Sequence, residues 1–269
     1  RFIIGVIICV VVACVILGGI KRISKVATKV VPAMVCMYFI LVLYIIFTHL
    51  DAVPGVFASI FTEALTVKAG VGGGIGALAS IALIGIRRAA LVNEAGVGTA
   101  SMMHGASKNN EPVREGLVAM IGPSIDSGLV CTLTAIAILI QRDILPLGDG
   151  ISGSIAGLSV ALQAFDASIP GVGKYLLLLM LFFFAFSTMF SYSYYGQKCT
   201  GFLFGAKYSK YYNIFFLVML VVAAMIPLKA AVGLIDIAYA LMAFPTMITL
   251  FILSPKVKAE MKKYFAKNK

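Results

Sequence analysis

The chain of 269 residues contains no tryptophan, only two histidines and few charged side chains. Charged residues make up 12% of it, whereas hydrophobic residues make up 61% and the mean hydropathy is +1.03. A soluble domain is about one half apolar and roughly one quarter charged. The shortage of charge excludes an ordinary soluble domain and predicts an integral membrane protein. In the absence of tryptophan, we expect tyrosine to provide the aromatic anchoring at the membrane interface.

The residue patterns of enzymes and metal sites are also missing. The five cysteines form no CxxC pair and most lie inside apolar runs, so we interpret them as small buried hydrophobic side chains. No set of Ser, His and acidic residues indicates an intramembrane hydrolase, and we expect no enzyme, no organic cofactor and no His or Cys metal site. The basic residues are divided among short connections without interleaved aromatic residues, which argues against nucleic-acid binding.

Long apolar runs dominate the rest of the chain. A run of about 20 apolar residues is typical of a membrane-spanning helix, whereas barrel strands are alternating segments of about ten residues. The chain begins at Arg1 and enters such a run at once, which we interpret as a fragment whose earlier helices are missing. We predict one all-α transmembrane domain over 1–269, with spans at about 2–19, 31–50, 71–106 (broken), 116–140, 174–196, 211–228 and 231–253.

The few charges predict the orientation of the chain. Most of the 22 lysines and arginines lie between the first two spans, around the third, after the fifth and in the C-terminal tail. Because positively charged connections stay in the cytoplasm, we predict that the loops at 20–30 and 198–210 and the tail at 255–269 are cytoplasmic. The net charge of +11 then reflects topology and contact with the anionic lipid of the bilayer.

The stretch NEAGVGTA at 93–100 places a carboxylate, two glycines and a hydroxyl in an apolar chain. Glu94 costs several kcal/mol in a bilayer unless it is paired, protonated or close to water. Either the stretch lies just past the end of its span, with Glu94 paired to a nearby arginine, or Gly96 and Gly98 expose backbone groups to a cation or zwitterion. In both cases we expect 93–99 to interrupt a helix, because each glycine costs about 1 kcal/mol in a helix interior.

Two further polar features lie inside predicted spans. In FFFAFSTMFSYSYYG (182–196), Ser187, Thr188 and Tyr192 recur at helical spacing and place hydroxyls beside aromatic rings. This face either lines a transport pathway or packs against another helix through its Ser and Thr side chains. Asp126 follows a Gly-Pro pair in the fourth span, where it is either functional or an acceptor for backbone N–H groups that the kink exposes.

Four stretches together resemble the alanine or glycine:cation symporter family: GGIKRISKVATKVVP (18–32), NEAGVGTA (93–100), PVREGLVAMIGPSIDSGLVCTLTA (112–135) and FAFSTMFSYSYYG (184–196). They occur in order over nearly the whole chain. The resemblance implies a LeuT-type inverted-repeat transporter, of which this chain holds the last seven of eleven helices and lacks the first-repeat half of the site. It also implies sodium-coupled symport of a small neutral amino acid, with sodium as the coupling ion, across a bacterial or archaeal plasma membrane.

The resemblance also implies roles for individual residues. Tyr192 stands where the family usually has tryptophan, which leaves the shape of the pocket and the preferred amino acid open. The alternative function is a non-transporting or channel-like membrane protein whose glycines serve helix packing. Substrate binding is implied for Gly96, Val97, Gly98, Thr188 and Tyr192, sodium binding for Ser187 and Thr188, and a gating or structural role for Asn93, Glu94 and Asp126.

Overall fold

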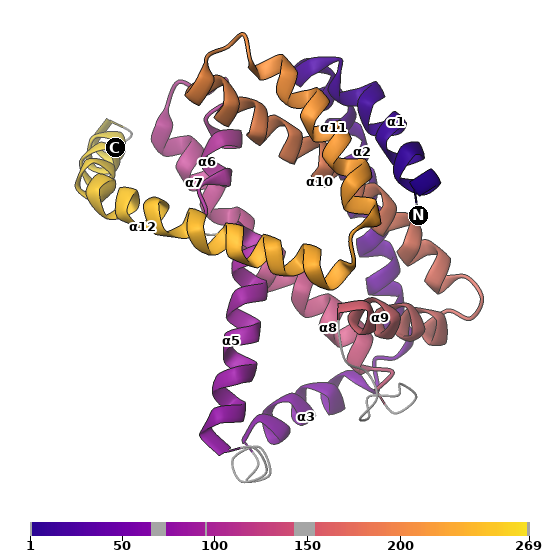
Figure 1. Ribbon diagram of the computed structural model, residues 1–269. Coiled ribbons are helices and arrows are strands. Elements are labelled where there is room, and N and C mark those ends of the chain that lie inside the picture. The colour runs from indigo at the N-terminus through magenta and orange to yellow at the C-terminus, as the bar shows by residue number, and fades with distance from the viewer. Residues whose placement is uncertain (1, 66–73, 95, 143–153, 268–269) are drawn as a thin grey trace. The chain divides into compact units, whose positions relative to one another are not determined.

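The structure, a computed structural model, describes residues 2–65, 74–94, 96–142 and 154–267 (Figure 1). These residues form helices and connecting turns and contain no strand, which confirms the all-α prediction. Predicted features at 66–73, at Ala95 and at 143–153 lie outside the described residues. The chain divides into a first unit, Arg1–Val53 with Ala135–Val232, and a second unit, Pro54–Thr134 with Gly233–Lys269.

The first unit is a bundle of long apolar helices. In it α11 lies alongside α1 and α10, and α10 also packs against α2 and α9 (Figure 1). The end of α8, which runs from Cys131 to Leu139, also belongs to this unit. The helices that lie within the first unit are α1 (Phe2–Ile16), α2 (Gly19–Thr48), α9 (Ser154–Ser168), α10 (Gly173–Phe204) and α11 (Ser209–Met225).

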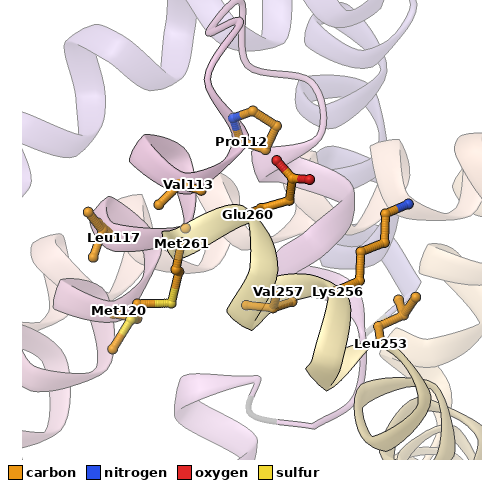
Figure 2. A pocket seen from close by; sticks show the side chains of 10 residues that line it. Pro112, Val113, Leu117, Met120, Leu253, Lys256, Val257, Glu260 and Met261 are labelled. Atoms are coloured by element: carbon orange, nitrogen blue, oxygen red, sulfur yellow. The ribbon is translucent and has the colours of Figure 1, made fainter. Parts of the chain in front are cut away.

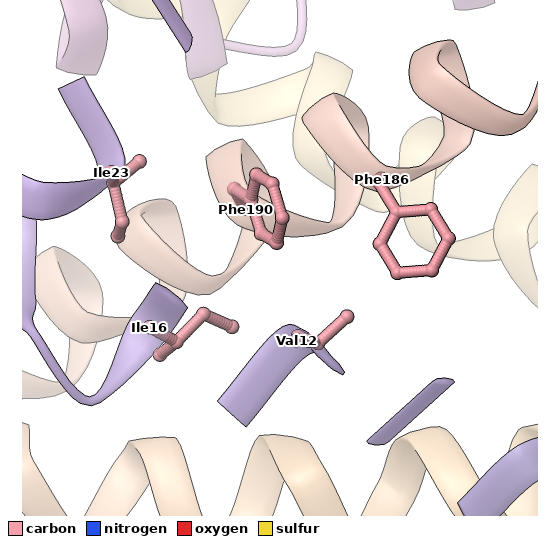
Figure 3. Close-up of a cluster of buried hydrophobic side chains, with 5 residues drawn as sticks. All are labelled: Val12, Ile16, Ile23, Phe186 and Phe190. Atoms are coloured by element: carbon pink, nitrogen blue, oxygen red, sulfur yellow. The ribbon is translucent and has the colours of Figure 1, made fainter. Parts of the chain in front are cut away.

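A cluster of apolar side chains joins three helices of this bundle (Figure 3). Phe186 and Phe190 of α10, whose ring centroids are 6.2 Å apart, lie in one cluster with side chains of α1 and α2. Because lipid is as apolar as these side chains, close packing and not water exclusion holds membrane helices together. The buried members of the cluster are Val12, Ile16, Ile23, Phe186 and Phe190.

A close approach of two helices depends on Gly196. A Cβ atom at this position of α10 would collide with the ring of Tyr212 on α11. At the next position of α10, the side-chain amide of Gln197 donates to Oδ1 of Asn213, which is itself buried. The glycine thus lets α10 and α11 approach closely enough for two polar side chains to satisfy each other inside an apolar bundle.

The second unit contains several shorter helices, one irregular span and most of the long α12. Pro123 has no N–H group, and the chain after it widens into a π-helix, in which the Cys131 N–H donates to the Asp126 carbonyl five residues back. This unit also holds the C-terminal helix from Gly233 onward. Its helices are α3 (Val53–Leu65), α5 (Gly74–Asn93), α6 (Thr99–His104), α7 (Pro112–Pro123), η1 (Ser124–Val130), the start of α8 and most of α12 (Leu228–Lys267).

Several segments that we predicted to be loops are helical. Residues 21–29 lie within α2, residues 198–204 end α10, and residues 255–267 continue α12 past Pro255. Lysine and arginine are good helix formers, so a run of basic residues ends the apolar part of a helix without ending the helix. Among the residues that the structure describes, four helical stretches are long and apolar enough to cross a membrane: Arg22–Thr48, Pro112–Leu139, Gly173–Phe204 and Leu228–Lys267. Phe2–Ile16, Val53–Thr62 and Ser209–Met225 are shorter apolar helices.

Candidate functional site

The helix interruption lies between α5, which ends at Asn93, and α6, which begins at Thr99. The backbone takes left-handed values at three described residues: φ is 50° at Glu94, 76° at Gly96 and 85° at Gly98. Glycine adopts such values easily, whereas a residue with a Cβ atom does so at a cost of about 1–2 kcal/mol. The strained Glu94 and the two glycines reverse the chain locally, so the helix stops where the sequence predicts.

The two glycines also let this turn approach α12 closely. A Cβ atom on Gly98 would lie 3.1 Å from Oγ1 of Thr246, and one on Gly96 would lie 3.0 Å from Cε of Met247. Val97 between them is buried. The glycines therefore have two roles, because they permit the turn and they leave room for α12 to lie against it.

The exposed backbone of the turn is only partly satisfied by its own hydroxyls. The Ser101 hydroxyl donates to the carbonyl of Gly98 at 2.6 Å. Thr99 is 3% exposed, and its Oγ1 has no hydrogen-bond partner within the described part of the chain. A buried hydroxyl without a partner costs about 1–3 kcal/mol of stability. The hydroxyl of Thr99 therefore does not stabilise the fold, and its presence calls for a functional explanation.

A pocket of about 390 Å³ opens beside the turn within the second unit. Pockets of roughly this size hold small ligands. The walls of the pocket are mostly apolar, but they include the positively charged Arg87, the negatively charged Asp236 and the phenol of Tyr239. The sequence singled out Val97 but not Asp236 or Tyr239, because nothing local indicates that α12 lies against α5. The lining residues are Arg87, Ala90, Val97, Asp236, Ile237, Tyr239, Ala240 and Ala243.

Asn93 connects the end of α5 to the π-helix. Its side-chain Nδ2 donates to the Ser127 hydroxyl at 2.8 Å, and that hydroxyl donates back to Asn93 Oδ1 at 3.0 Å. Asp126, the neighbouring residue of η1, is half-buried, and its carboxylate accepts no hydrogen bond from any residue that the structure describes. Of the two roles that the sequence leaves open for Asp126, acceptance from backbone N–H groups by its carboxylate is not seen among the described residues; the Cys131 N–H donates to its backbone carbonyl instead.

The remaining predicted residues lie on α10, in the first unit. The hydroxyls of Ser187 and Thr188 both donate to the carbonyl of Phe184, at 2.8 and 2.9 Å. Because both hydroxyl hydrogens are donated within the helix, the lone pairs of the two hydroxyl oxygens remain available to coordinate a cation. The ring of Tyr192 stacks edge-on against Tyr195 with a centroid distance of 5.4 Å, so its position is held by a neighbour.

A compact polar network joins α6 to α7. The two carboxylate oxygens of Glu115 bind His104 Nδ1 at 2.8 Å and the hydroxyl of Ser107 at 2.9 Å. Glu111, which precedes α7, accepts a hydrogen bond from Lys267 Nζ at the end of α12, at 3.0 Å. Within the described residues, no three His, Cys, Asp or Glu side chains gather into a metal site. The network therefore fastens the connection and does not present a metal-binding cluster.

Comparison with known proteins identifies relatives along the whole chain. The model of the sodium:alanine symporter family matches residues 1–269. The sodium/alanine symporter AgcS of Methanococcus maripaludis is 34% identical over 97% of this chain. The uncharacterized transporter YflA of Bacillus subtilis is 36% identical over 97% of the chain, and the probable sodium/glutamine symporter GlnT of the same organism is 28% identical over all of it. The chain spans 56%, 55% and 55% of the lengths of these relatives, respectively.

Proposed function

The chain belongs to the sodium:alanine symporter family, and from that membership we propose that its protein is a secondary active transporter that couples sodium to the uptake of a small neutral amino acid. Two relatives support sodium as the coupling ion, since their names are sodium/alanine and probable sodium/glutamine symporter. The family consists of transporters, and the long apolar helices make this chain an integral membrane protein. The broken helix at 93–99, in the second unit, and the polar face of α10, in the first unit, are each proposed to take part in transport.

The observation that carries this proposal is the glycine-lined turn with a mixed-charge pocket beside it. A neutral amino acid carries a carboxylate and an ammonium group. Arg87 from α5 and Asp236 from α12 offer one partner for each, and the apolar Val97, Ile237 and Ala240 suit a short side chain. Irregular backbone in a membrane protein is tolerated where it lines such a cavity. Gly96, Val97 and Gly98 are thus proposed to border the amino-acid pathway.

Sodium is proposed to bind the oxygens of Ser187 and Thr188. Both hydroxyls already donate their hydrogens to the Phe184 carbonyl, so their lone pairs suit a hard cation that takes oxygen ligands. Tyr192, one turn further along α10, is proposed to limit the size of the substrate. Its ring is smaller than the indole that the family usually has there, which favours substrates somewhat larger than glycine.

We further propose a LeuT-type inverted-repeat architecture in which this chain supplies the last seven of eleven helices. The C-terminus is proposed to face the cytoplasm of a bacterial or archaeal cell. The bond between Lys267 and Glu111 supports this arrangement, because it brings the tail and the connection before α7 to the same membrane side, as the positive charges of both segments require. Labelling of single cysteines at 108 and 262 in intact cells with an impermeant reagent tests it, and labelling from outside would contradict it.

The function is tested by uptake of labelled alanine into proteoliposomes that contain the full-length protein. We expect accumulation above the external concentration when an inward sodium gradient is imposed, and none with potassium. A channel-like protein would equilibrate alanine without concentrating it, and a non-transporting protein would not move it. Arg87→Gln is expected to raise the half-saturating alanine concentration, whereas the neighbouring Arg88→Gln, which does not line the pocket, serves as the matched control.

A further inference from the structure

A second and larger hollow, which shares no lining residue with the pocket beside the turn, lies between α7 and the C-terminal part of α12 (Figure 2). Its volume is about 700 Å³, and all its lining residues belong to the second unit. The walls are mainly apolar. They are formed by Val113, Leu117 and Met120 of α7 and by Leu253, Val257 and Met261 of α12. We call this hollow the α7–α12 groove.

Positive charge exceeds negative charge on the part of α12 that borders the groove. Its rim holds Lys256 and Glu260 (Figure 2), but Glu260 is already paired with Lys263 at 2.8 Å. Glu111, next to the end of the groove at α7, is likewise paired with Lys267 at 3.0 Å. By contrast, in the part of the chain that the structure describes, no ion pair is formed by Lys256, Lys258 or Lys262. Lys256 also acts electrostatically on Glu260, so four lysines, at 256, 258, 262 and 263, share this one acid and leave an excess of positive charge at this end of α12.

The length of α12 places this rim at the membrane surface. The helix has 40 residues and is therefore about 60 Å long, twice the hydrocarbon thickness of roughly 30 Å. Its apolar part ends at Leu253, and the lysines begin at Lys256. The groove thus starts among apolar side chains and ends among lysines, which is the order of polarity from the acyl chains to the headgroup of a lipid.

A neighbouring hollow repeats the same combination. Met261 also borders a space of about 510 Å³ whose other walls include Lys258, Lys262 and Phe265. Apolar and basic side chains therefore alternate around the end of α12, and Met261 separates two apolar surfaces that lie next to each other. Two adjacent apolar surfaces with lysines at their edges match a ligand that has two hydrocarbon chains joined at one anionic group.

We propose that the α7–α12 groove is a binding site for an anionic phospholipid. One acyl chain lies between Leu117 and Val257, and the phosphate is held by Lys256. Lys258 and Lys262, which border the adjacent hollow at Met261, complete the cationic edge for the second chain. A soluble phosphate would gain nothing from the apolar walls. A zwitterionic lipid carries its own cation beside the phosphate and is attracted less by the lysines. The lipid fastens α7 to α12 next to the contact between Glu111 and Lys267.

Native mass spectrometry of the detergent-purified full-length protein tests the site, with titration of phosphatidylglycerol and of phosphatidylcholine that have the same chains. The triple variant Lys256→Gln, Lys258→Gln and Lys262→Gln removes the cationic edge. A second triple variant, with Lys198→Gln, Lys207→Gln and Lys210→Gln, removes the same amount of charge from the first unit and serves as the matched control. Because one lysine near an anionic surface contributes about fivefold, we expect the first triple variant to bind phosphatidylglycerol at least about tenfold more weakly. Phosphatidylcholine binding by that variant, and all lipid binding by the control, should stay within about twofold of the unaltered protein.

The apolar half of the site is tested separately with Val257→Trp, which fills the groove. We expect this variant to bind both lipids more weakly. Circular dichroism shows whether its helices remain folded. Leu203→Trp, at an exposed position of α10, is the control. Three results would each overturn the proposal: equal phosphatidylglycerol binding by the Lys256 triple variant and the unaltered protein, displacement of the lipid by millimolar inorganic phosphate, or no retained lipid on the unaltered protein. The last would mean that another polypeptide segment covers the groove.

Discussion

Asn93 and Ser127 exchange two hydrogen bonds, one in each direction, at 2.8 and 3.0 Å between their side-chain atoms. This pair joins the last residue of α5, where the helix breaks, to the π-helix that follows Pro123. The hydrogen bonds therefore join two segments in which the regular α-helical hydrogen bonding is interrupted, and each segment stabilises the other. Ser127→Ala should lower the free energy of unfolding by about 1 kcal/mol, the range of hydrogen bonds between membrane helices, and should reduce alanine uptake.

Reversible unfolding in mixed micelles measures the first effect. Ser124→Ala is the matched control, because Ser124 lies in the same π-helix and its hydroxyl makes no hydrogen bond to any described residue. An equal loss of stability in the two variants would show that the pair with Asn93 contributes nothing specific.

Gly98→Ala should be among the most damaging single-methyl changes in the second unit. The alanine would have to hold a φ of 85° and place its Cβ atom 3.1 Å from Thr246 Oγ1. We expect a loss of about 1–3 kcal/mol in stability together with most of the uptake. Thr246→Ala in the same protein should recover the part that is due to the contact.

The control for this change is Gly85→Ala. Gly85 lies inside α5, has open space around it and has no left-handed backbone, so alanine should be neutral or stabilise the helix by up to about 1 kcal/mol. If the Gly85 and Gly98 variants behave alike, the turn does not need its glycine.

Thr99→Val should make the protein more stable and less active. It removes a buried hydroxyl that has no hydrogen-bond partner in the described structure, and we expect a gain of about 1 kcal/mol in unfolding free energy. Ser101→Ala, which removes the hydroxyl bonded to the Gly98 carbonyl, should instead destabilise. Thermal unfolding and sodium-dependent uptake are measured on both. Unchanged uptake in Thr99→Val would show that the hydroxyl has no part in transport.

Thr188→Val and Tyr192→Trp should alter transport by different routes. The valine keeps the shape of Thr188 and deletes an oxygen, so the half-saturating sodium concentration should rise while folding is preserved. The larger ring at Tyr192 should favour the smallest amino acids by tens of fold, since one methylene in a pocket is worth about 1–3 kcal/mol. Thr249→Val, which deletes a similarly bonded hydroxyl from α12, is the control. A sodium response and a substrate ratio that both stay constant would identify this face of α10 as packing.

Glu115→Ala should loosen the connection between α6 and α7. The carboxylate binds both His104 and Ser107, and the Ser107 hydroxyl in turn accepts from the Asn109 N–H. Hydrogen exchange of the amides at 104–111 should become several-fold faster. Glu260→Ala removes an exposed acid that is paired only within its own helix and should leave these amides unchanged. Unaltered exchange in the Glu115 variant would show that the backbone turns alone hold the connection.

The sequence alone determined the class of the protein, its helical architecture and its family. These follow from local or additive properties: the shortage of charge, the length of the apolar runs and the order of motifs along the chain. The interruption after Asn93 was also predictable, because the conformational preference of glycine acts at its own position. The basic segments at 21–29 and 255–267 misled the prediction, since charge marks where a helix leaves the membrane and not where it ends.

Only the tertiary structure decided which residues share a site. Asn93 and Ser127 are 34 positions apart, and Thr246 and Asp236 reach the turn at Gly98 and Val97 from the other end of the chain. Contacts of this kind depend on how apolar helices pack in a medium that is as apolar as they are, so no hydrophobic pattern marks the face that meets a neighbour. Asp236 was for this reason overlooked as a site residue. The groove between Val113 and Val257 was hidden likewise, because each wall alone resembles any lipid-facing helix.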